Sequence, residues 1–351
     1  MTATTPPLSD HVPQDVADWL RDGLPEAEPP IAFDRIAGGY SMLTYRMTDR
    51  AGHAWALRHA PAGHSGGRAH DAAREARAMA ALWDTAVPVP RVRMTGGAAD
   101  PLGVPCHVTD FVEGFVLDRA EQARRVLTPG GLRRASIEIV SVLAELHAVD
   151  PDAVGLGDLG PRADYNGRQL RRFRAVLADL EALDSPLDGG RTARLARLGA
   201  ELADRLPRDA RGRIVHGDYR LGNAITGADG SVRAVLDWEL VTLGEPLADL
   251  GMLLNYWNPP PGAMLGATVP TAAPGSVTEA EAIAVYARMS GADLGRLSLY
   301  RSLAAWRLAC LCLRTAMRFD SGAMDGGEDP RRFASTTDQW TDLARAHLDQ
   351  D

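Results

Sequence analysis

Apolar and polar positions in the first third of the chain follow the pattern of a small sheet. Residues 15–20 carry apolar side chains at helical spacing, which predicts a short helix there. Strand-like runs follow at 31–36, 43–48, 54–59, near Val92 and at 106–111. Between the third and fourth runs, a helix is predicted from about 69 to 84. The sheet pattern ends at Val112-Glu113-Gly114, which indicates a hinge.

After residue 112 the pattern becomes helical. Apolar residues recur at helical spacing between Leu132 and Val149. Further helices are predicted at 169–183, 192–205, 247–257, 279–289, 293–318 and 330–349. In the longest of them, Trp306 belongs to an apolar stripe and Arg307 is expected to lie away from it. The chain is therefore expected to be α+β, with one region at 1–112 and a larger, mostly helical region at 113–351.

Composition narrows the function classes. A chain of 351 residues is long enough for two lobes or domains. Its formal net charge of −8 and pI near 5.6 argue against general nucleic-acid binding, which needs a basic face. All 38 basic residues are arginine, so mechanisms that need a Walker-A lysine or a Schiff-base lysine are excluded. A side chain that binds phosphate through its positive charge must then be arginine.

No segment of the sequence predicts export or membrane insertion. The opening residues, MTATTPPLSDHVPQ, contain no apolar run of the kind a signal peptide needs. No run of 18 uncharged apolar residues is present. Cys106, Cys310 and Cys312 form neither a disulfide framework nor a metal-ligand spacing. We therefore expect a cytoplasmic protein with no membrane or nucleic-acid partner.

The strongest chemical signal lies about two thirds of the way along the chain. His216, Asp218 and Asn223 are spaced as His-x-Asp-x4-Asn, and Asp237 follows after 13 residues. A tight turn at residues 227–230 joins two short strands, so we expect Asn223 and Asp237 to come close together, with Asp218 on the loop before them. One base and two oxygen ligands for a hard cation are what phosphoryl transfer from a magnesium nucleotide needs. The alternative is a solvated polar loop with an Asx turn at Asn223.

A second group of residues, in the first region, is expected to bind the nucleotide. Gly38, Gly39 and Ser41 lie between two predicted strands and could lay backbone N–H groups over phosphates, although a plain hairpin turn explains the glycines equally well. Arg58 ends a strand where a kinase lobe carries its phosphate-binding lysine, and Glu75 in the following helix is its natural partner. Each charge alone would be an ordinary surface group. In order with the later aspartates and asparagine, they form a kinase-like set.

These motifs resemble the phosphotransferase family of kinase-like folds that includes aminoglycoside and choline kinases. HGDYRLGN is similar to the family's catalytic loop and LDWE to its metal-binding segment. The resemblance implies a protein-kinase-like two-lobed fold, with an antiparallel sheet and a helix in the N-lobe and a mostly helical C-lobe. It also implies ATP or GTP as the phosphoryl donor, Mg²⁺ as the cofactor and a small-molecule acceptor.

The resemblance gives roles to residues of the second region. It implies that Asp218 is the catalytic base, that Asn223 and Asp237 are magnesium ligands, and that Asp249 is buried and ties down the catalytic loop. Gly217 stands where protein kinases have arginine, no Ala-Pro-Glu follows, and the step from Glu239 to Pro246 is too short for an activation loop. Protein substrates and control by phosphorylation are therefore not expected.

The same resemblance covers the nucleotide end. Arg58, paired with Glu75, resembles the anchor of the α- and β-phosphates, and Ser41 lies in the loop above them. Phe111 and Val112 resemble the hinge whose backbone pairs with adenine. The closest branch is the one associated with acyl-CoA dehydrogenases, with WALRHAPAG, REARAMAAL and LGEPLADLG among the shared segments. Arginine is usual at this strand position in that branch, so it does not indicate a dead enzyme.

The acceptor is the least direct prediction. Residues 251–278 carry no charged side chain, which suits an apolar acyl chain better than a polycationic aminoglycoside. Arg168, Arg171, Arg172 and Arg174 cluster at one helix start and would either hold an anionic handle or form a solvated face. The branch resemblance implies a hydroxyacyl-CoA-type acceptor. The alternatives are an aminoglycoside, macrolide or other antibiotic, a sugar or amino alcohol, and a non-catalytic nucleotide-binding pseudokinase.

Overall fold

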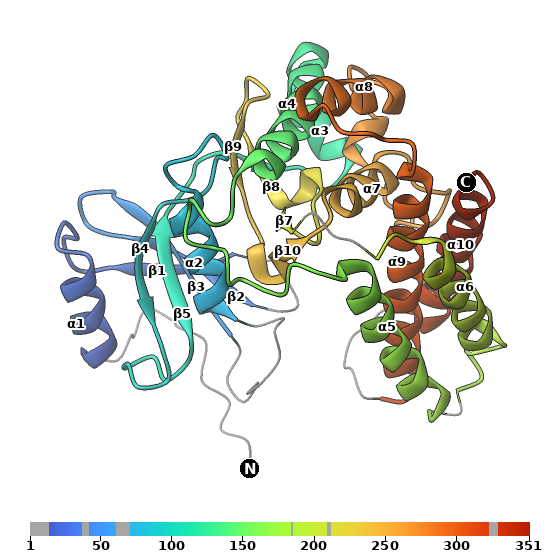
Figure 1. The fold of residues 1–351 in the computed structure, drawn as a ribbon. Helices are drawn as coiled ribbons and strands as arrows, with labels where there is room; N and C mark the ends of the chain where they lie inside the picture. The colour runs from blue at the N-terminus through green and yellow to red at the C-terminus, as the bar shows by residue number, and fades with distance from the viewer. Residues whose placement is uncertain (1–13, 37–41, 61–70, 184, 209–211, 323–328) are drawn as a thin grey trace. The chain divides into compact units, whose positions relative to one another are not determined.

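The computed structural model describes residues 14–36, 42–60, 71–183, 185–208, 212–322 and 329–351. The chain divides into two compact units, Met1–Gly114 with Arg233–Val241, and Phe115–Val232 with Thr242–Asp351 (Figure 1). The predicted α+β class is confirmed, because the first unit holds an antiparallel sheet and the second is mostly helical. A segment from late in the chain joins the first unit, which the consecutive ranges 1–112 and 113–351 do not anticipate.

The first unit is built on a five-stranded antiparallel sheet. Its order is β1-β2-β3-β5-β4. The strands are β1 Ala32–Ile36, β2 Leu43–Thr48, β3 Ala54–His59, β4 Val92–Gly96 and β5 Cys106–Asp110. All five were predicted from the sequence, and β2 and β3 have the predicted bounds. Buried and half-buried side chains alternate along β3, so successive residues of that strand face opposite sides of the sheet.

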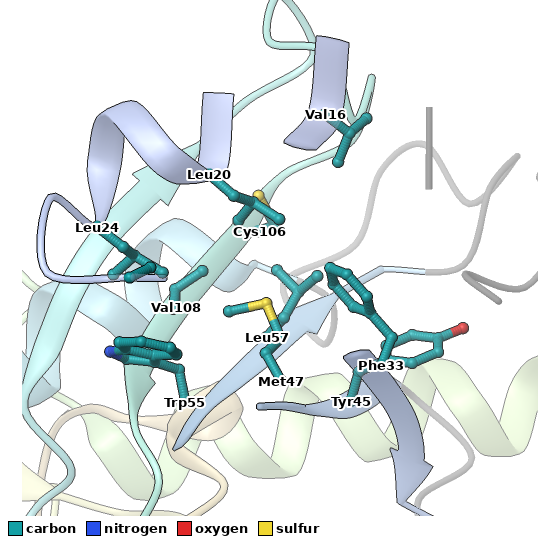
Figure 2. Packing of buried hydrophobic residues seen from close by; sticks show 11 residues of the cluster. Val16, Leu20, Leu24, Phe33, Tyr45, Met47, Trp55, Leu57, Cys106 and Val108 are labelled. Atoms are coloured by element: carbon teal, nitrogen blue, oxygen red, sulfur yellow. The ribbon is translucent and has the colours of Figure 1, made fainter. Parts of the chain in front are cut away.

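The two faces of this sheet carry different chemistry. On one face, the helix α1, Gln14–Gly23, packs over an apolar core that includes Leu57 of β3 (Figure 2). Arg58 comes next in β3 and pairs in register with His107 of β5, so both face the other side. There His107 Nδ1 lies 3.3 Å from the carbonyl oxygen of the first residue of α2, Ala72–Leu82. Strand alternation therefore directs Arg58 away from the apolar core and towards α2.

Helices make up most of the second unit. They are α3 Ala120–Val126, α4 Pro129–Ala148, α5 Tyr165–Glu181, α6 Arg191–Arg205, α7 Pro246–Trp257, α8 Glu279–Ser290, α9 Leu297–Asp320 and α10 Pro330–Leu348. The long helix α9 packs against α5, α6, α7 and α10 (Figure 1), which explains its many buried residues. No helix in the described part of the chain is both long and apolar enough to cross a membrane.

Short strands lead into and out of the central motif. β7, Arg213–Val215, pairs antiparallel with β10, Thr242–Gly244. β8, Ala224–Thr226, pairs with β6, Phe115–Val116, and leads through a turn into β9, Val232–Val235. The Gly227 N–H donates to the carbonyl of Ser231 at 2.8 Å, and Gly230 has φ +85°. The predicted tight turn is confirmed, and glycine meets its left-handed backbone without strain.

Three helices illustrate where the structure differs from the sequence predictions. α3 was missed because it has only seven residues and a short apolar pattern. α5 begins at Tyr165 instead of residue 169, because its first turn, Tyr-Asn-Gly-Arg, lacks an apolar repeat. α9 begins at Leu297 instead of residue 293, because the Asp293 side chain accepts the Gly295 N–H at 2.9 Å and forms a local turn.

Candidate active site

The loop after β7 is fixed through its backbone. The Asp249 carboxylate of α7 accepts the N–H groups of His216 and Gly217 at 2.5 and 2.8 Å. Gly217 has φ +93°, a left-handed backbone that glycine adopts without strain. On the other side, Arg307 Nη2 donates to the Gly217 carbonyl at 3.1 Å. The expectation that Asp249 ties down this loop is confirmed.

Arg307 corrects a sequence prediction. It was expected to lie away from the apolar stripe of α9, but it is 5% exposed and its guanidinium reaches the loop. Charged residues in amphipathic helices usually face solvent, so the periodicity gave no signal for this one. A buried arginine needs acceptors, and here the Gly217 carbonyl is one of them.

Asp249 is itself buried beside a histidine. It is 1% exposed, and its Oδ2 lies 3.6 Å from His147 Nε2 of α4. His147 Nδ1 lies 2.7 Å from the Tyr286 hydroxyl of α8. Burial on its own would raise the pKa of Asp249, but His147, His216 and the Gly217 N–H bond hold that pKa below its usual value. Asp249 therefore stays ionised and keeps accepting both backbone N–H groups.

Asp218 follows directly and meets Asn223 within the same loop. Asn223 Nδ2 donates to the backbone carbonyl of Asp218 at 2.8 Å and to its Oδ2 at 3.1 Å. Those two bonds use the amide nitrogen, so the Asn223 Oδ1 faces away from Asp218 and is left for another partner. Arg220 was not predicted as a site residue, yet its Nε lies 3.7 Å from Asp218 Oδ2. A cation two residues after a candidate base was the signal in the sequence.

In the first unit, three charged residues form a cluster. Arg58 Nη1 lies 3.2 Å from Glu75 Oε1, and Arg58 Nη2 lies 2.5 Å from Asp237 Oδ1. The predicted pairing of Arg58 with Glu75 is confirmed. Glu75 Oε1 also accepts the Trp238 N–H at 3.2 Å. Burial raises the pKa of Glu75 to about 7, although the Arg58 guanidinium acts in the opposite direction.

This cluster has binding capacity that the chain does not use. Arg58 Nε and Glu75 Oε2 are buried and have no hydrogen-bond partner among the described residues. Asp237 Oδ2 also has no hydrogen-bond or ion-pair partner in the described part of the chain. A carboxylate oxygen and a spare arginine donor suit a hard cation and a phosphate group respectively. Within the described ranges, no group of three or more His, Cys, Asp or Glu side chains is arranged to hold a metal ion, so a cation at Asp237 would need oxygen ligands of other kinds as well.

The remaining predicted nucleotide residues are placed as follows. Ser41 lies outside the described residues, as do Gly38 and Gly39. The Phe111 N–H donates to the Ala54 carbonyl at 3.1 Å, and the Arg46 guanidinium lies 4.4 Å from the centre of the Phe111 ring. The backbone N–H and carbonyl of Val112 make no hydrogen bond within the described ranges, so they can pair with a ligand.

The uncharged segment 251–278 lines a hollow together with residues of the Asp218 loop. Trp257, Met264 and Val269 from residues 251–278 line a hollow together with Arg220 and the two residues after it. The remaining lining residues are Leu117, Asp118, Leu253, Tyr256, Pro270 and Thr271. The hollow measures about 20 Å³, about the room of one water. Its lining is apolar apart from Asp118, Arg220 and a few hydroxyls.

The arginines of α5 already have contacts within the chain. Arg168 donates to the carbonyl oxygens of Ala163 and Leu243, the latter at 2.9 Å. Arg171 binds Asp164 at 2.8 Å, and Arg174 donates to the Gly199 carbonyl at 3.2 Å. The guanidinium of Arg172 lies 5.7 Å from the centre of the Phe173 ring. The guanidinium of Arg168 in particular is already used in hydrogen bonds within the chain.

Comparison with known proteins identifies the family. The profile of the phosphotransferase enzyme family matches residues 33–306, which include Arg58, the Asp218 loop and Asp237. The chain belongs to this family. It is a phosphotransferase that acts on a hydroxyl group.

Two curated relatives carry a similar region. Acyl-CoA dehydrogenase family member 10 from Mus musculus is 32% identical over 254 residues, 71% of this chain and 23% of the relative. Acyl-CoA dehydrogenase family member 11 from Homo sapiens is 27% identical over 328 residues, 88% of this chain and 39% of the relative. The phosphotransferase therefore spans less than half the length of these relatives.

Solved structures confirm the kinase-like fold. A Ralstonia eutropha protein provisionally classed as an aminoglycoside phosphotransferase has a TM-score of 0.79 and 25% identity, covering 96% of this chain and 98% of its own. An aminoglycoside phosphotransferase solved with GDP and kanamycin has a TM-score of 0.62 and 14% identity, with 94% and 98% covered. The second likeness concerns the fold alone.

Proposed function

We propose that this phosphotransferase moves the γ-phosphoryl group of ATP or GTP to the hydroxyl of a small molecule with an apolar chain, best represented by a hydroxyacyl-CoA. The observation that carries the proposal is the hollow beside the catalytic loop, where the uncharged segment 251–278 supplies the wall. An acyl chain suits such a wall, because burying apolar groups there leaves no charge unpaired. At about 20 Å³ the hollow is nearly filled, so a long chain requires side chains such as Met264 to move.

In this proposal Asp218 is the base. Its carboxylate orients the acceptor hydroxyl and takes its proton as the oxygen bonds to the γ-phosphorus. The bond from that phosphorus to the β–γ bridging oxygen breaks, and the nucleoside diphosphate leaves with the electron pair. Asn223 holds one Asp218 oxygen at 3.1 Å, which leaves Oδ1 for the hydroxyl.

Arg58 and Asp237 serve the nucleotide. The Arg58 guanidinium binds the α- and β-phosphates, while Glu75 keeps it in place. Asp237 Oδ2 and Asn223 Oδ1 would hold Mg²⁺, which neutralises charge on the phosphate oxygens when bound. Val112 offers backbone groups to adenine beside Phe111, and Ser41 belongs to the loop over the phosphates.

An aminoglycoside is the second candidate acceptor. The observation in its favour is the 25% identity to the Ralstonia eutropha protein over 96% of this chain. Against it stands the wall at 251–278, since a polycation needs several carboxylates and this segment has none. Asp118 is the one acidic residue on the lining, and Arg220 already binds it. A pseudokinase is disfavoured, because a binding module has no need of Asp218.

The test is consumption of ATP and GTP by purified protein with three acceptor classes: hydroxyacyl-CoAs, aminoglycosides and macrolides. Product formation is followed by mass spectrometry as a gain of one phosphoryl group. The expected result is turnover of a hydroxyacyl-CoA with little or none of the antibiotics. Efficient phosphorylation of kanamycin with no turnover of hydroxyacyl-CoAs would overturn the acceptor and leave the kinase assignment standing.

A further inference from the structure

Arg220 is held between two carboxylates of the second unit. Its Nη1 donates to Asp118 Oδ1 at 2.8 Å, and its Nε lies 3.7 Å from Asp218 Oδ2. The guanidinium carbon lies 5.5 Å from the centre of the Tyr256 ring, which contacts Trp340 edge-on at 6.4 Å. A planar fork can contact two carboxylates and an aromatic face at once. Arg220 is therefore fixed on three sides, one of which is the base.

Gly222 provides a second, independent sign that this arrangement is specific. A Cβ built at this position would overlap both Asp118 Oδ1 and Arg220 Nη1. The backbone at Gly222 is not in the left-handed region, so the absent side chain, not the backbone angle, explains the glycine here. The Asp118–Arg220 ion pair occupies the space above Gly222, one residue before Asn223.

From these contacts we infer that Arg220 is a positioning residue for Asp218, and that Asp118 acts through Arg220. This inference rests on the proposed role of Asp218 as base. Asn223 and Arg220 both lie at Asp218 Oδ2, so together they turn Oδ1 towards the acceptor. Without the guanidinium the carboxylate can rotate, and a displacement of about 1 Å at a reacting group costs about a hundredfold in rate.

The first experiment separates charge from packing at Arg220. Arg220→Met keeps the length and the apolar contact with Tyr256, whereas Arg220→Lys keeps the positive charge. Positioning by charge predicts that kcat falls about 10- to 100-fold in Arg220→Met and only about threefold in Arg220→Lys, with nucleotide KM within about twofold of wild type in both. Equal kcat in the two variants would mean that Arg220 acts through packing alone, which overturns the inference.

A matched control is available in the same unit. Arg134 also binds an aspartate distant in sequence, Asp229, at 2.8 Å, and both residues are half-exposed. Arg134→Met makes the same change in side chain and charge without touching the catalytic loop. It is expected to leave kcat unchanged within about 1.5-fold, because exposed ion pairs contribute little free energy and this one is not in the catalytic loop. A fall as large as that in Arg220→Met would show a general charge effect and contradict the inference.

The second experiment asks whether Asp118 acts through Arg220. Asp118→Asn is expected to lower kcat about threefold to tenfold, because Arg220 loses one of its two anchors. In Arg220→Met the same change should have no further effect, which is a non-additive double-mutant cycle. Additive losses would show that Asp118 acts on the reaction by another route.

The third experiment displaces the ion pair without altering any charge. Gly222→Ala should push Asp118 and Arg220 apart and lower kcat about as much as Asp118→Asn does. Gly130→Ala is the control, because its nearest atom lies 3.9 Å from the built Cβ. Unchanged kcat in Gly222→Ala would contradict a positioning role. If Asp218→Asn itself stays active, the proposed function fails first; if it is inactive while Arg220→Met equals wild type, only this inference fails.

Discussion

The two ends of the phosphotransferase chemistry are held by different forces. In the first unit Arg58 lies between Glu75 and Asp237, so opposite charges set its position. In the second unit Asp218 is placed through the backbone of its loop, which Asp249 binds through two N–H groups. A guanidinium can exchange a carboxylate for a phosphate when a nucleotide arrives, whereas buried backbone hydrogen bonds keep one geometry. The proposed nucleotide site is suited to rearrange, and the proposed base is suited to stay fixed.

Backbone strain also differs between the two sites, and it lies at the site that we expect to rearrange. Gly217 and Asp237 both have a positive φ, +93° and +66°. Glycine adopts this conformation freely, but aspartate does so at a cost of about 1 kcal/mol. The fixed loop therefore carries no strain at Gly217, while one member of the ion cluster, Asp237, has a strained backbone. Strained residues concentrate where a ligand changes the local structure.

The largest effect is expected at the fixed end. Asp218→Asn removes the proposed proton acceptor, so kcat should fall by at least about a thousandfold. Nucleotide affinity should survive, since Arg58 and Asp237 are unchanged; a binding titration and a single-turnover assay measure the two quantities separately. Asp229→Asn in the β8–β9 turn is the control for the same change. Retention of more than about a tenth of wild-type turnover would mean that Asp218 is not the base.

The next effect tests whether the loop is fixed by Asp249. Asp249→Ala leaves the His216 and Gly217 N–H groups buried without an acceptor, each at a cost of about 1–3 kcal/mol. The urea midpoint should drop and kcat should fall together. Asp249→Asn keeps one acceptor oxygen, so its urea midpoint and kcat should lie between those of the wild type and Asp249→Ala. If Asp249→Ala unfolds at the same urea concentration as the wild type, Asp249 does not fix the loop and the contrast between the two sites is wrong.

A smaller effect is expected at the proposed magnesium ligands, Asp237 and Asn223. Asp237→Asn removes the charge but keeps a side chain that tolerates a positive φ, so it separates metal binding from backbone strain. We expect it to raise the magnesium concentration for half-maximal activity about tenfold or more, and Asn223→Ala to raise it less. Asp237→Ala should add a loss of stability that Asp237→Asn lacks. Unchanged magnesium titrations in both positions would sink the metal assignment.

Some contacts could be predicted from the sequence, because the two partners occur in an order along the chain that the family motifs share. Arg58 with Glu75, and the loop with Asp249, are such cases, and their contacts are present. The first sheet was predictable too, because short strand-like runs are separated by segments that contain glycine or proline. Arg307 and Arg220 were not assigned, because their roles depend on which distant residues face them. Helical periodicity placed Arg307 in solvent, although burial brings it to the Gly217 carbonyl.

Gly222 is another residue whose role could not be predicted from the sequence. A glycine in a sequence often signals a positive φ, but Gly222 lies in the short 3₁₀ turn Leu221–Asn223 without one. Its reason is the Asp118–Arg220 ion pair that occupies the space of a side chain. Only the folded structure, which brings Asp118 beside the loop 102 residues later, shows that reason.

Replacing Arg58 tests whether its site needs the two-pronged guanidinium of arginine, and we expect a moderate change in nucleotide KM. Arg58 contacts Glu75 through one nitrogen and Asp237 through the other. Lysine offers one point charge, so Arg58→Lys should raise the nucleotide KM about three- to tenfold. Arg58→Ala should do more, and Glu75→Ala less, since Glu75 only positions Arg58. A double-mutant cycle checks this, because strictly additive effects of Arg58→Ala and Glu75→Ala would show that the two residues act independently.

The smallest effect concerns the arginines of α5 and the acceptor. Arg168 donates to the Leu243 carbonyl, so the informative variants are at the more exposed Arg171 and Arg172. If a CoA phosphate uses them, Arg171→Gln with Arg172→Gln should raise the hydroxyacyl-CoA KM about twofold to threefold and weaken its salt dependence, with nucleotide KM unchanged. Arg134→Gln is the control for a lost surface charge. A cationic aminoglycoside acceptor predicts the opposite sign, because removing nearby positive charge then leaves KM unchanged or lowers it. The direction of the KM change therefore identifies which acceptor charge this helix meets.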